Sequence, residues 1–158
     1  METTQEKLRG FEWVSKYDNT SDLSLPKRST SDSAGYDFVA IEDTTVPSIT
    51  ETLETTLVST GVKAYMPASE FLLLANRSSS PRKRQLILPN GVGIIDSDYY
   101  NNEENEGEIF LQLMNFGKET QVIKRGERIC QGIFMPYGVI DNEEKIRKSR
   151  SGGFGSTD

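Results

Sequence analysis

The sequence predicts an all-β protein, a sandwich or jelly-roll barrel that carries one short helix. Four segments are short, rich in β-branched or large apolar residues, and separated by Gly, Pro, Asn and Asp; they are residues 56–66, 71–75, 108–116 and 120–135. No window keeps a helical period of apolar residues for more than a few turns. We therefore expect strands in all four segments, within one β domain over residues 1–138. A polar arm over residues 139–158 follows.

Length and composition are typical of one soluble domain. The chain has 158 residues, 35% of them hydrophobic, and no apolar run approaches the length of a membrane span. The opening METTQEKLRG lacks the apolar middle and cleavage site of a secretory signal, and the single Cys130 cannot form a disulfide within the chain. We expect a protein of the reducing cytoplasm, that of the host if a phage encodes it, with no membrane partner.

Charge and the lack of histidine restrict the chemistry. The formal net charge is -6, so the surface should repel nucleic acids, although a local basic cluster can hold a small anion. The sequence has no histidine, which removes the commonest general base, the commonest zinc ligand and every Ser/His or Cys/His nucleophile pair. A hydrolase of this composition needs a carboxylate as its base, and its metal would be magnesium carried in on phosphates.

The short helix is predicted over residues 78–86, where serines can cap the first turn and Pro81 suits its start. The overlapping segment 76–84 gathers four cationic side chains. Free N–H groups at a helix start favour an anion such as a triphosphate. A solvated surface is the alternative interpretation of this charge run.

Residues 88–100, LPNGVGIIDSDYY, predict a hairpin at the Asn90-Gly91 pair. The mouth of a hairpin can read the edge of a planar base, and an ordinary turn with acidic residues in water is the alternative. Asp96 follows two isoleucines and should be partly desolvated, and desolvation and nearby phosphates both strengthen a carboxylate as a base. We therefore expect Asp96 to be the base and Asp98 to have a turn or ion-pair role.

Two further segments are polar. Residues 101–108, NNEENEGE, indicate an acidic hairpin tip. The chain ends on SRSGGFGSTD, whose glycines, hydroxyl groups and Phe154 suit a nucleotide, although a terminus also collects such residues where nothing packs. The arm is long enough to reach a neighbouring subunit. Arg128 and Gln131 look like ordinary strand-surface residues unless the fold places them at a site.

Five short segments follow one another along the chain: AGYDF at 34–38, RSSS at 77–80, NGVGIIDSDY at 90–99, RICQ at 128–131 and SGGFGST at 151–157. In this order they resemble the motifs of the trimeric deoxyuridine triphosphatases (dUTPases). Each motif is weak alone, whereas five in order over most of the chain are highly specific. The opening RGFEWVSKYDN also resembles the first strand of the versions found in Gram-positive bacteria and their phages.

The resemblance implies a β-clip or distorted jelly-roll homotrimer, with an exchanged C-terminal arm and three active sites at subunit interfaces. It implies hydrolysis of dUTP to dUMP and pyrophosphate, with Mg2+ on the triphosphate. This reaction limits uracil incorporation into DNA and supplies dUMP. A sister class on the same fold deaminates dCTP, and it also needs neither histidine nor zinc. A nucleotide-sensing protein with a regulatory protein partner on loop 101–106 is the remaining alternative.

The resemblance also implies roles for individual residues. Asp96 would activate the attacking water and hold the 3'-hydroxyl, Gln131 would contact that water, and Asn90 would contact the uracil region. Tyr99 would pack under the sugar and exclude a 2'-hydroxyl, and the arm would close as a lid with Phe154 over uracil. Asp37 would touch the hydrated magnesium ion. The other expected substrate-binding residues are Arg77, Ser78, Ser79, Gly93, Ile95, Arg128, Arg150, Gly155, Ser156 and Thr157.

Several positions depart from the family's pattern. Asn76 and Ser79 stand where the second motif often has Pro and Gly. Arg150 lies one step later than the arginine of many members, which leaves Arg147 and Lys148 as rival contacts for the γ-phosphate. The acidic insertion 101–106 lengthens the usual hairpin, and the sequence assigns it no role.

Overall fold

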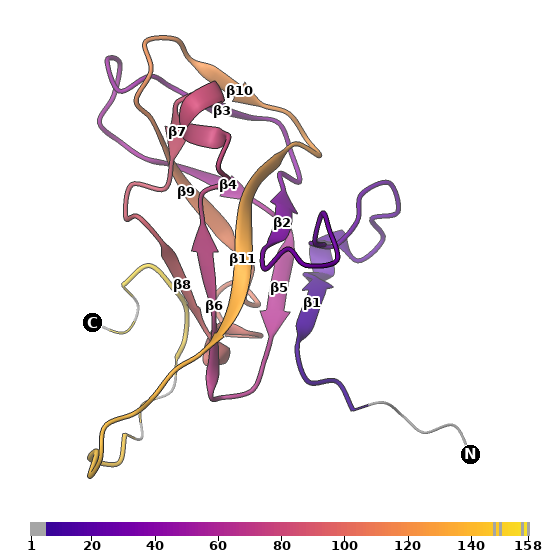
Figure 1. The fold of residues 1–158 in the computed structure, drawn as a ribbon, viewed down its shortest axis with the longest axis vertical. Coiled ribbons are helices and arrows are strands. Elements are labelled where there is room, and N and C mark those ends of the chain that lie inside the picture. The colour runs from indigo at the N-terminus through magenta and orange to yellow at the C-terminus, as the bar shows by residue number, and fades with distance from the viewer. Residues whose placement is uncertain (1–5, 147, 149, 156, 158) are drawn as a thin grey trace.

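The computed structural model describes residues 6–146, 148, 150–155 and 157, and Figure 1 shows their arrangement. Its strands are β1 (Gly10–Trp13), β2 (Tyr36–Val39), β3 (Thr44–Val46), β4 (Thr56–Ser59), β5 (Val62–Tyr65), β6 (Glu70–Ala75), β7 (Leu86–Ile87), β8 (Gly93–Asp96), β9 (Phe110–Asn115), β10 (Gln121–Ile123) and β11 (Arg128–Pro136). Three single helical turns interrupt them: η1 (Ser15–Tyr17), η2 (Ser80–Arg84) and η3 (Ser97–Tyr99). The predicted all-β class with one short helix near residue 80 is confirmed. No helix in the described part of the chain is long and apolar enough to span a membrane.

Two main sheets organise the strands. The larger sheet has the order β2-β11-β6-β8, and the other has the order β4-β9-β7. β1 pairs with β5 and β10 pairs with β3 at the periphery. Side chains of both sheets meet in one core, whose largest fully buried members include Phe38, Leu72, Ile109, Leu111, Leu113 and Ile123. Strand β9 shows the expected period of two, because its residues alternate between half-buried and buried positions.

Two of the four predicted strand segments are divided by glycine. Residues 56–66 form β4 and β5, and Gly61 between them has a φ of +69°. Residues 120–135 form β10 and β11, and Gly126 before the second strand has a φ of +85°. Glycine adopts this left-handed conformation at little cost, so each glycine turns the chain from one sheet pairing into another.

The predicted helix 78–86 is shorter than expected. It is one π-type turn from Ser80 to Arg84, and Ser79 at its start makes no side-chain cap hydrogen bond within the described structure. Gln85 ends the turn in the left-handed region, with a φ of +51°. The prediction that serines cap this turn is therefore wrong, and so is that of a helix continuing through residue 86.

The two predicted hairpins are also wrong in their strand pairing. The Asn90-Gly91 turn does form, with a hydrogen bond of 3.0 Å from Gly91 N to Leu88 O. The strands on either side of it separate, because β7 pairs with β9 whereas β8 pairs with β6. Residues 101–108 likewise connect strands of two different sheets, β8 and β9, and fold into a compact loop instead of a hairpin tip.

Candidate active site

A cavity of about 190 Å3 lies where β8 and η3 meet the C-terminal arm. Seven of the expected site residues line it: Asn90, Gly93, Ile95, Asp96, Tyr99, Arg150 and Phe154. Its walls are apolar side chains of β6 and β9 with Leu88, and Gln112 adds an amide that the sequence did not single out. An apolar cavity with a few convergent polar groups is the usual form of a small-molecule site.

Asp96 ends β8 at the edge of this cavity. Its side chain is 49% exposed, and it forms an ion pair with Arg150 Nη2. Asp96 is therefore partly shielded from solvent, as expected, although the end of an edge strand leaves about half of its side chain open. Asp98 accepts a hydrogen bond of 2.9 Å from Arg150 Nε, which confirms its expected ion-pair role.

Tyr99 forms the floor of the cavity. Its side chain is buried, and its hydroxyl donates to Glu108 O at 2.6 Å and accepts from Asn105 Nδ2 at 2.8 Å. Burial raises the pKa of the Tyr99 hydroxyl above its ordinary value, so the hydroxyl stays neutral near neutral pH. Tyr99 therefore presents an uncharged aromatic ring to the cavity. Sequence analysis did not identify Asn105 as a site residue. The asparagines that follow Tyr99 were the available indication, because asparagine side chains often hydrogen-bond to the backbone of a turn.

The arm covers one side of the cavity from the same chain. Glu104 N donates to Ser151 O at 3.0 Å, and a Cβ on Gly153 would lie 2.9 Å from the Tyr99 ring, so this part of the arm packs on the loop and the ring. Phe154 lines the cavity with 64% of its surface exposed. Gly155 and Thr157 are exposed, and Lys148 Nζ donates to Thr157 O at 2.6 Å. Ser156 and Arg147 lie outside the described residues.

A second group of expected site residues lies on β2, β11 and the chain after β6. The Asp37 carboxylate lies 3.2 Å from Arg77 Nε and 3.6 Å from Arg128 Nη1. Gln131 stands opposite Asp37 in the β2–β11 register and donates to Asn76 O at 3.1 Å. Ser78 is exposed and Ser79 is half-buried beside this group. We call Asp37, Arg77, Arg128 and Gln131 the cationic cluster.

Glycine lies next to the cationic cluster in the first motif. A Cβ on Gly35 would lie 2.1 Å from Gln131 Oε1. A larger residue before Tyr36 would therefore displace the Gln131 amide, which donates to Asn76 O.

The strand register separates Gln131 from Asp96 within one chain. Gln131 stands opposite Ala75 at one end of β6, whereas Asp96 stands opposite Phe71 near the other end. Four residues of extended strand span about 13 Å, and β11 and β8 flank β6 on opposite sides. One chain therefore does not bring Gln131 to the water that Asp96 would activate.

The described residues provide no preformed metal centre and no thiol nucleophile. They contain no group of three or more His, Cys, Asp or Glu side chains that could hold a metal ion. Burial raises the pKa of the Cys130 thiol to about 12, so this cysteine stays protonated near neutral pH. Among the described site residues, the carboxylates can accept a proton, whereas the amides and guanidinium groups can bind a substrate.

Comparisons with known proteins agree with these features. The dUTPase family model matches residues 21–158. The chain is 52% identical over 153 residues to the deoxyuridine 5'-triphosphate nucleotidohydrolase of Lactococcus lactis subsp. lactis, covering 96% of this chain and 98% of that protein. It is 34% identical over 143 residues to the protein of that name from Escherichia phage T5, covering 84% of this chain and 90% of that protein.

Two solved structures show the same fold. The crystal structure of dUTPase from Streptococcus mutans matches with a TM-score of 0.78 and 49% identity, over 84% of this chain and 99% of that chain. A mutant dUTPase from phage phi11 of S. aureus, described with a structural Mg(II) ion, matches with a TM-score of 0.67 over 90% of this chain and 98% of that chain. Its identity is 17%, so this second likeness concerns the fold alone.

Proposed function

Because this chain belongs to the dUTPase family, we propose that it hydrolyses dUTP to dUMP and pyrophosphate. The observation that carries the proposal is the cavity in which Asp96, Tyr99 and Phe154 surround a space of about 190 Å3. An acid at the rim, an aromatic floor and an aromatic cover suit a pyrimidine deoxynucleotide with its phosphates toward solvent. The reaction limits uracil incorporation into DNA and supplies dUMP.

Asp96 is the general base of the proposed mechanism. It takes a proton from water as the water oxygen attacks the α-phosphorus in line with the leaving pyrophosphate, so that the P–O bond to the β-phosphate breaks as the new one forms. Its exposed carboxylate can meet a water molecule and the 3'-hydroxyl of the sugar. Gln131 holds the same water from the cationic cluster of another subunit.

The remaining contacts select the substrate and neutralise its charge. Backbone groups of Gly93 and Ile95, with the Asn90 amide, read the uracil edge, and Tyr99 packs under the deoxyribose. Arg77 and Arg128 hold phosphates with the hydroxyls of Ser78 and Ser79. Arg150 leaves Asp96 for the γ-phosphate, and its arm closes with Phe154 over the base. Gly155, Ser156 and Thr157 complete the lid.

Magnesium enters on the triphosphate in this proposal. The described residues fit that mode, because single carboxylates such as Asp37 can accept hydrogen bonds from metal-bound water although no group of three could hold a bare ion. When bound, Mg2+ neutralises charge that develops on the leaving pyrophosphate. In the structure both Asp37 oxygens are near arginines, so Asp37 also sets the position of Arg77 and Arg128.

We expect a homotrimer from family membership, and the separation of the two groups supports sites shared between subunits. The cavity holds the proposed base and the base-binding residues, and the cationic cluster holds the proposed phosphate-binding residues. Gln131 of the cluster lies about 13 Å from Asp96 along β6. Packing the cluster of one subunit against the cavity of the next would complete three equal sites. Exchange of the arm between subunits would reproduce the contacts that it makes within the chain.

Pyrophosphate release from dUTP, dCTP, dATP, dGTP and dTTP, measured side by side with Mg2+, tests the proposal. We expect release from dUTP alone. Ammonia release from dCTP would assign the chain to the deaminases instead. Retention of dUTP without turnover would favour a nucleotide-sensing protein, for which loop 101–106 is the predicted contact of a regulatory partner. A chelator should abolish turnover of dUTP, and added Mg2+ should restore it.

A further inference from the structure

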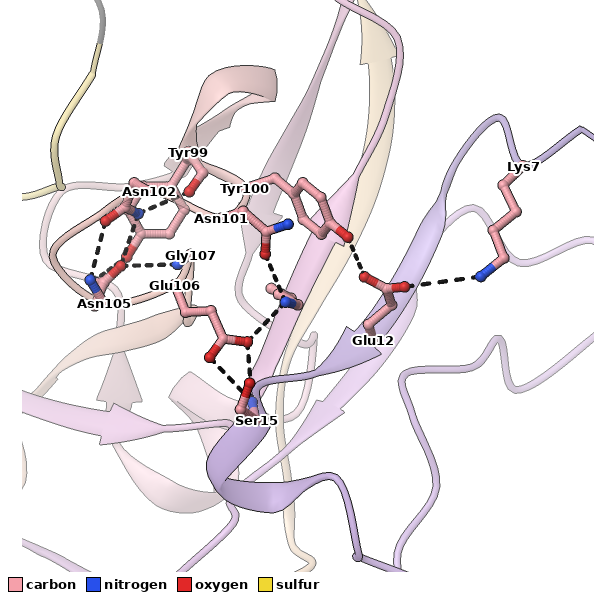
Figure 2. Close-up of polar contacts among 11 residues, drawn as sticks. Lys7, Glu12, Ser15, Tyr99, Tyr100, Asn101, Asn102, Asn105, Glu106 and Gly107 are labelled. Atoms are coloured by element: carbon pink, nitrogen blue, oxygen red, sulfur yellow. Dashed lines mark hydrogen bonds and ion pairs between the residues drawn. The ribbon is translucent and has the colours of Figure 1, made fainter.

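The insertion after Tyr99 forms a compact loop built on two asparagine side chains. Figure 2 shows that Asn102 and Asn105 lie beside Tyr99 on one side of the loop, whereas Glu106 faces Ser15 on the other. On that second side, Asn101 and Glu106 both accept hydrogen bonds from Lys63 Nζ. Asn102 is buried, with 7% of its surface exposed. A buried amide side chain requires hydrogen-bond partners, and those of Asn102 define the loop.

Asn102 sets the path of the loop backbone. Its Nδ2 donates to Tyr99 O and to Asn105 Oδ1, both at 2.8 Å, and its Oδ1 accepts from Glu104 N at 3.0 Å and from Asn105 N at 3.1 Å. The tight return passes Gly107, with a φ of +90°, where a Cβ would lie 2.8 Å from Tyr99 O. The loop therefore closes directly onto the backbone of Tyr99.

Asn105 joins the loop to the tip of the Tyr99 ring. Its Oδ1 accepts from Asn102 Nδ2 and, at 3.0 Å, from Gly107 N, which fixes the amide plane and directs Nδ2 at the Tyr99 hydroxyl, 2.8 Å away. The hydroxyl has Glu108 O as its other partner. A phenol held by one hydrogen bond can tilt about that contact, whereas two partners in different directions fix the ring plane.

The loop is itself fastened to the body of the protein. Glu106 accepts hydrogen bonds from Ser15 N at 3.0 Å and from Lys63 Nζ at 2.7 Å, and Asn101 Oδ1 accepts from the same Lys63 Nζ at 2.6 Å. These contacts connect the loop to η1 and β5, away from the cavity. Asn105 therefore acts from a rigid support.

We propose that Asn105 is a positioning residue that fixes the Tyr99 ring and so sets the preference for a deoxyribose over a ribose. The inference rests on the proposed function, in which Tyr99 packs under the sugar. Asn105 does not line the cavity and acts only through the ring. A difference of one hydroxyl is discriminated only when the surface that excludes it cannot move.

The matched pair Asn105→Asp and Asn101→Asp tests the proposal in the full-length protein. Both changes are nearly isosteric and add one negative charge to the same loop. Asn105→Asp keeps the acceptor for Asn102 and Gly107 but loses the donor toward Tyr99, whereas Asn101→Asp keeps its acceptor for Lys63. The ratio of kcat/KM for dUTP to that for UTP should fall about tenfold or more in Asn105→Asp and Asn105→Ala, and less than twofold in Asn101→Asp.

A double-mutant cycle of Tyr99→Phe and Asn105→Asp separates positioning of the ring from a general loss of structure. Removal of the hydroxyl should lower the dUTP to UTP ratio by a similar factor, and Asn105→Asp should then have no further effect. Equal losses for dUTP and UTP, with the ratio unchanged, would assign Asn105 a purely structural role and overturn the proposal. A full additional loss in the Tyr99→Phe background would overturn it as well.

A measurement without turnover keeps this inference distinct from the proposed function. In the ligand-free protein, the flip rate of the Tyr99 ring, measured by NMR after selective tyrosine labelling, should rise about tenfold or more in Asn105→Ala. It should be unchanged in Asn101→Asp. An unchanged flip rate in Asn105→Ala would refute the positioning role whatever the substrate is, whereas absence of dUTP hydrolysis by the parent protein would refute the proposed function.

Discussion

Arg150 Nε lies 2.9 Å from Asp98 Oδ1, and Nη2 of the same guanidinium pairs with Asp96. The arm therefore places its cation on the carboxylate that we expect to be the base. The Arg150 side chain is 17% exposed, so this pair is more shielded than an ordinary surface pair. A triphosphate would offer Arg150 a more highly charged partner than Asp96. When the Arg150 side chain moves to the triphosphate as the lid closes, the Asp96 carboxylate becomes free to act as the base.

Asp96→Asn should lower kcat for dUTP by on the order of a hundredfold or more, because a positioned base typically contributes that much. The amide keeps the shape of the carboxylate, so the melting temperature and the affinity for a non-hydrolysable dUTP analogue should be retained. Asp98→Asn is the matched control, and kcat should change less than threefold. Near-normal turnover in Asp96→Asn would exclude this residue as the base.

Deletion of residues 150–158 should abolish most turnover and leave the melting temperature nearly unchanged. Phe154, the one large apolar side chain in the deleted sequence, is 64% exposed. Loss of the lid removes phosphate donors and admits water to the developing charge. The turnover of Phe154→Ala should lie between that of the parent and that of the deletion. If the ring stacks on uracil, we expect a cost of roughly 1 to 3 kcal/mol in kcat/KM. Turnover at the parent level by the truncated protein would show that the arm is not a lid.

Mixed trimers should show whether the arm serves its own chain or a neighbour. Asp96→Asn subunits carry an intact arm, and subunits truncated at residue 149 carry an intact Asp96, so each is inactive alone. If the arm is exchanged, mixing them after subunit dissociation should recover a measurable fraction of parent activity. If each arm covers its own cavity, as in the single chain, verified mixed trimers should remain inactive.

Glu106→Gln should destabilise the protein near neutral pH and have a smaller effect in acid. Hydrogen bonds from Lys63 and Ser15 lower the pKa of Glu106 below its ordinary value of 4.5. A carboxylate with a depressed folded-state pKa stabilises the protein above about pH 4.5 and loses that contribution as the pH falls through the folded value. The difference in unfolding free energy should be about 1 kcal/mol at pH 7, since Glu106 is partly exposed, and should shrink as the pH falls below 4.5 through the folded-state pKa.

Urea titrations of parent and Glu106→Gln at fixed protein concentration would measure this dependence. Glu103→Gln is the matched control, because Glu103 lies in the same loop and is exposed. A difference that does not shrink as the pH falls below 4.5 would show that the carboxylate charge is not what holds the loop to η1 and β5.

The amino-acid sequence was sufficient to predict the all-β class, the absence of histidine chemistry and the residues that we expect to contact a nucleotide. Alternating apolar positions such as those of β9 identify which face of a strand is buried, and the five motifs identify Asp96, Tyr99 and Phe154. These properties are local, because a side chain's chemistry and its place in a period of two do not depend on distant residues.

Which strands pair, and therefore where the expected residues meet, became known only with the folded structure. The Asn90-Gly91 turn joins two sheets, and the four-residue offset along β6 keeps Gln131 away from Asp96. Strand pairing is set by contacts between residues far apart in the chain, which periodicity does not record. The Asn105–Tyr99 hydrogen bond depends likewise on the path of a whole loop, so a single sequence could indicate the asparagines but not the ring that they hold.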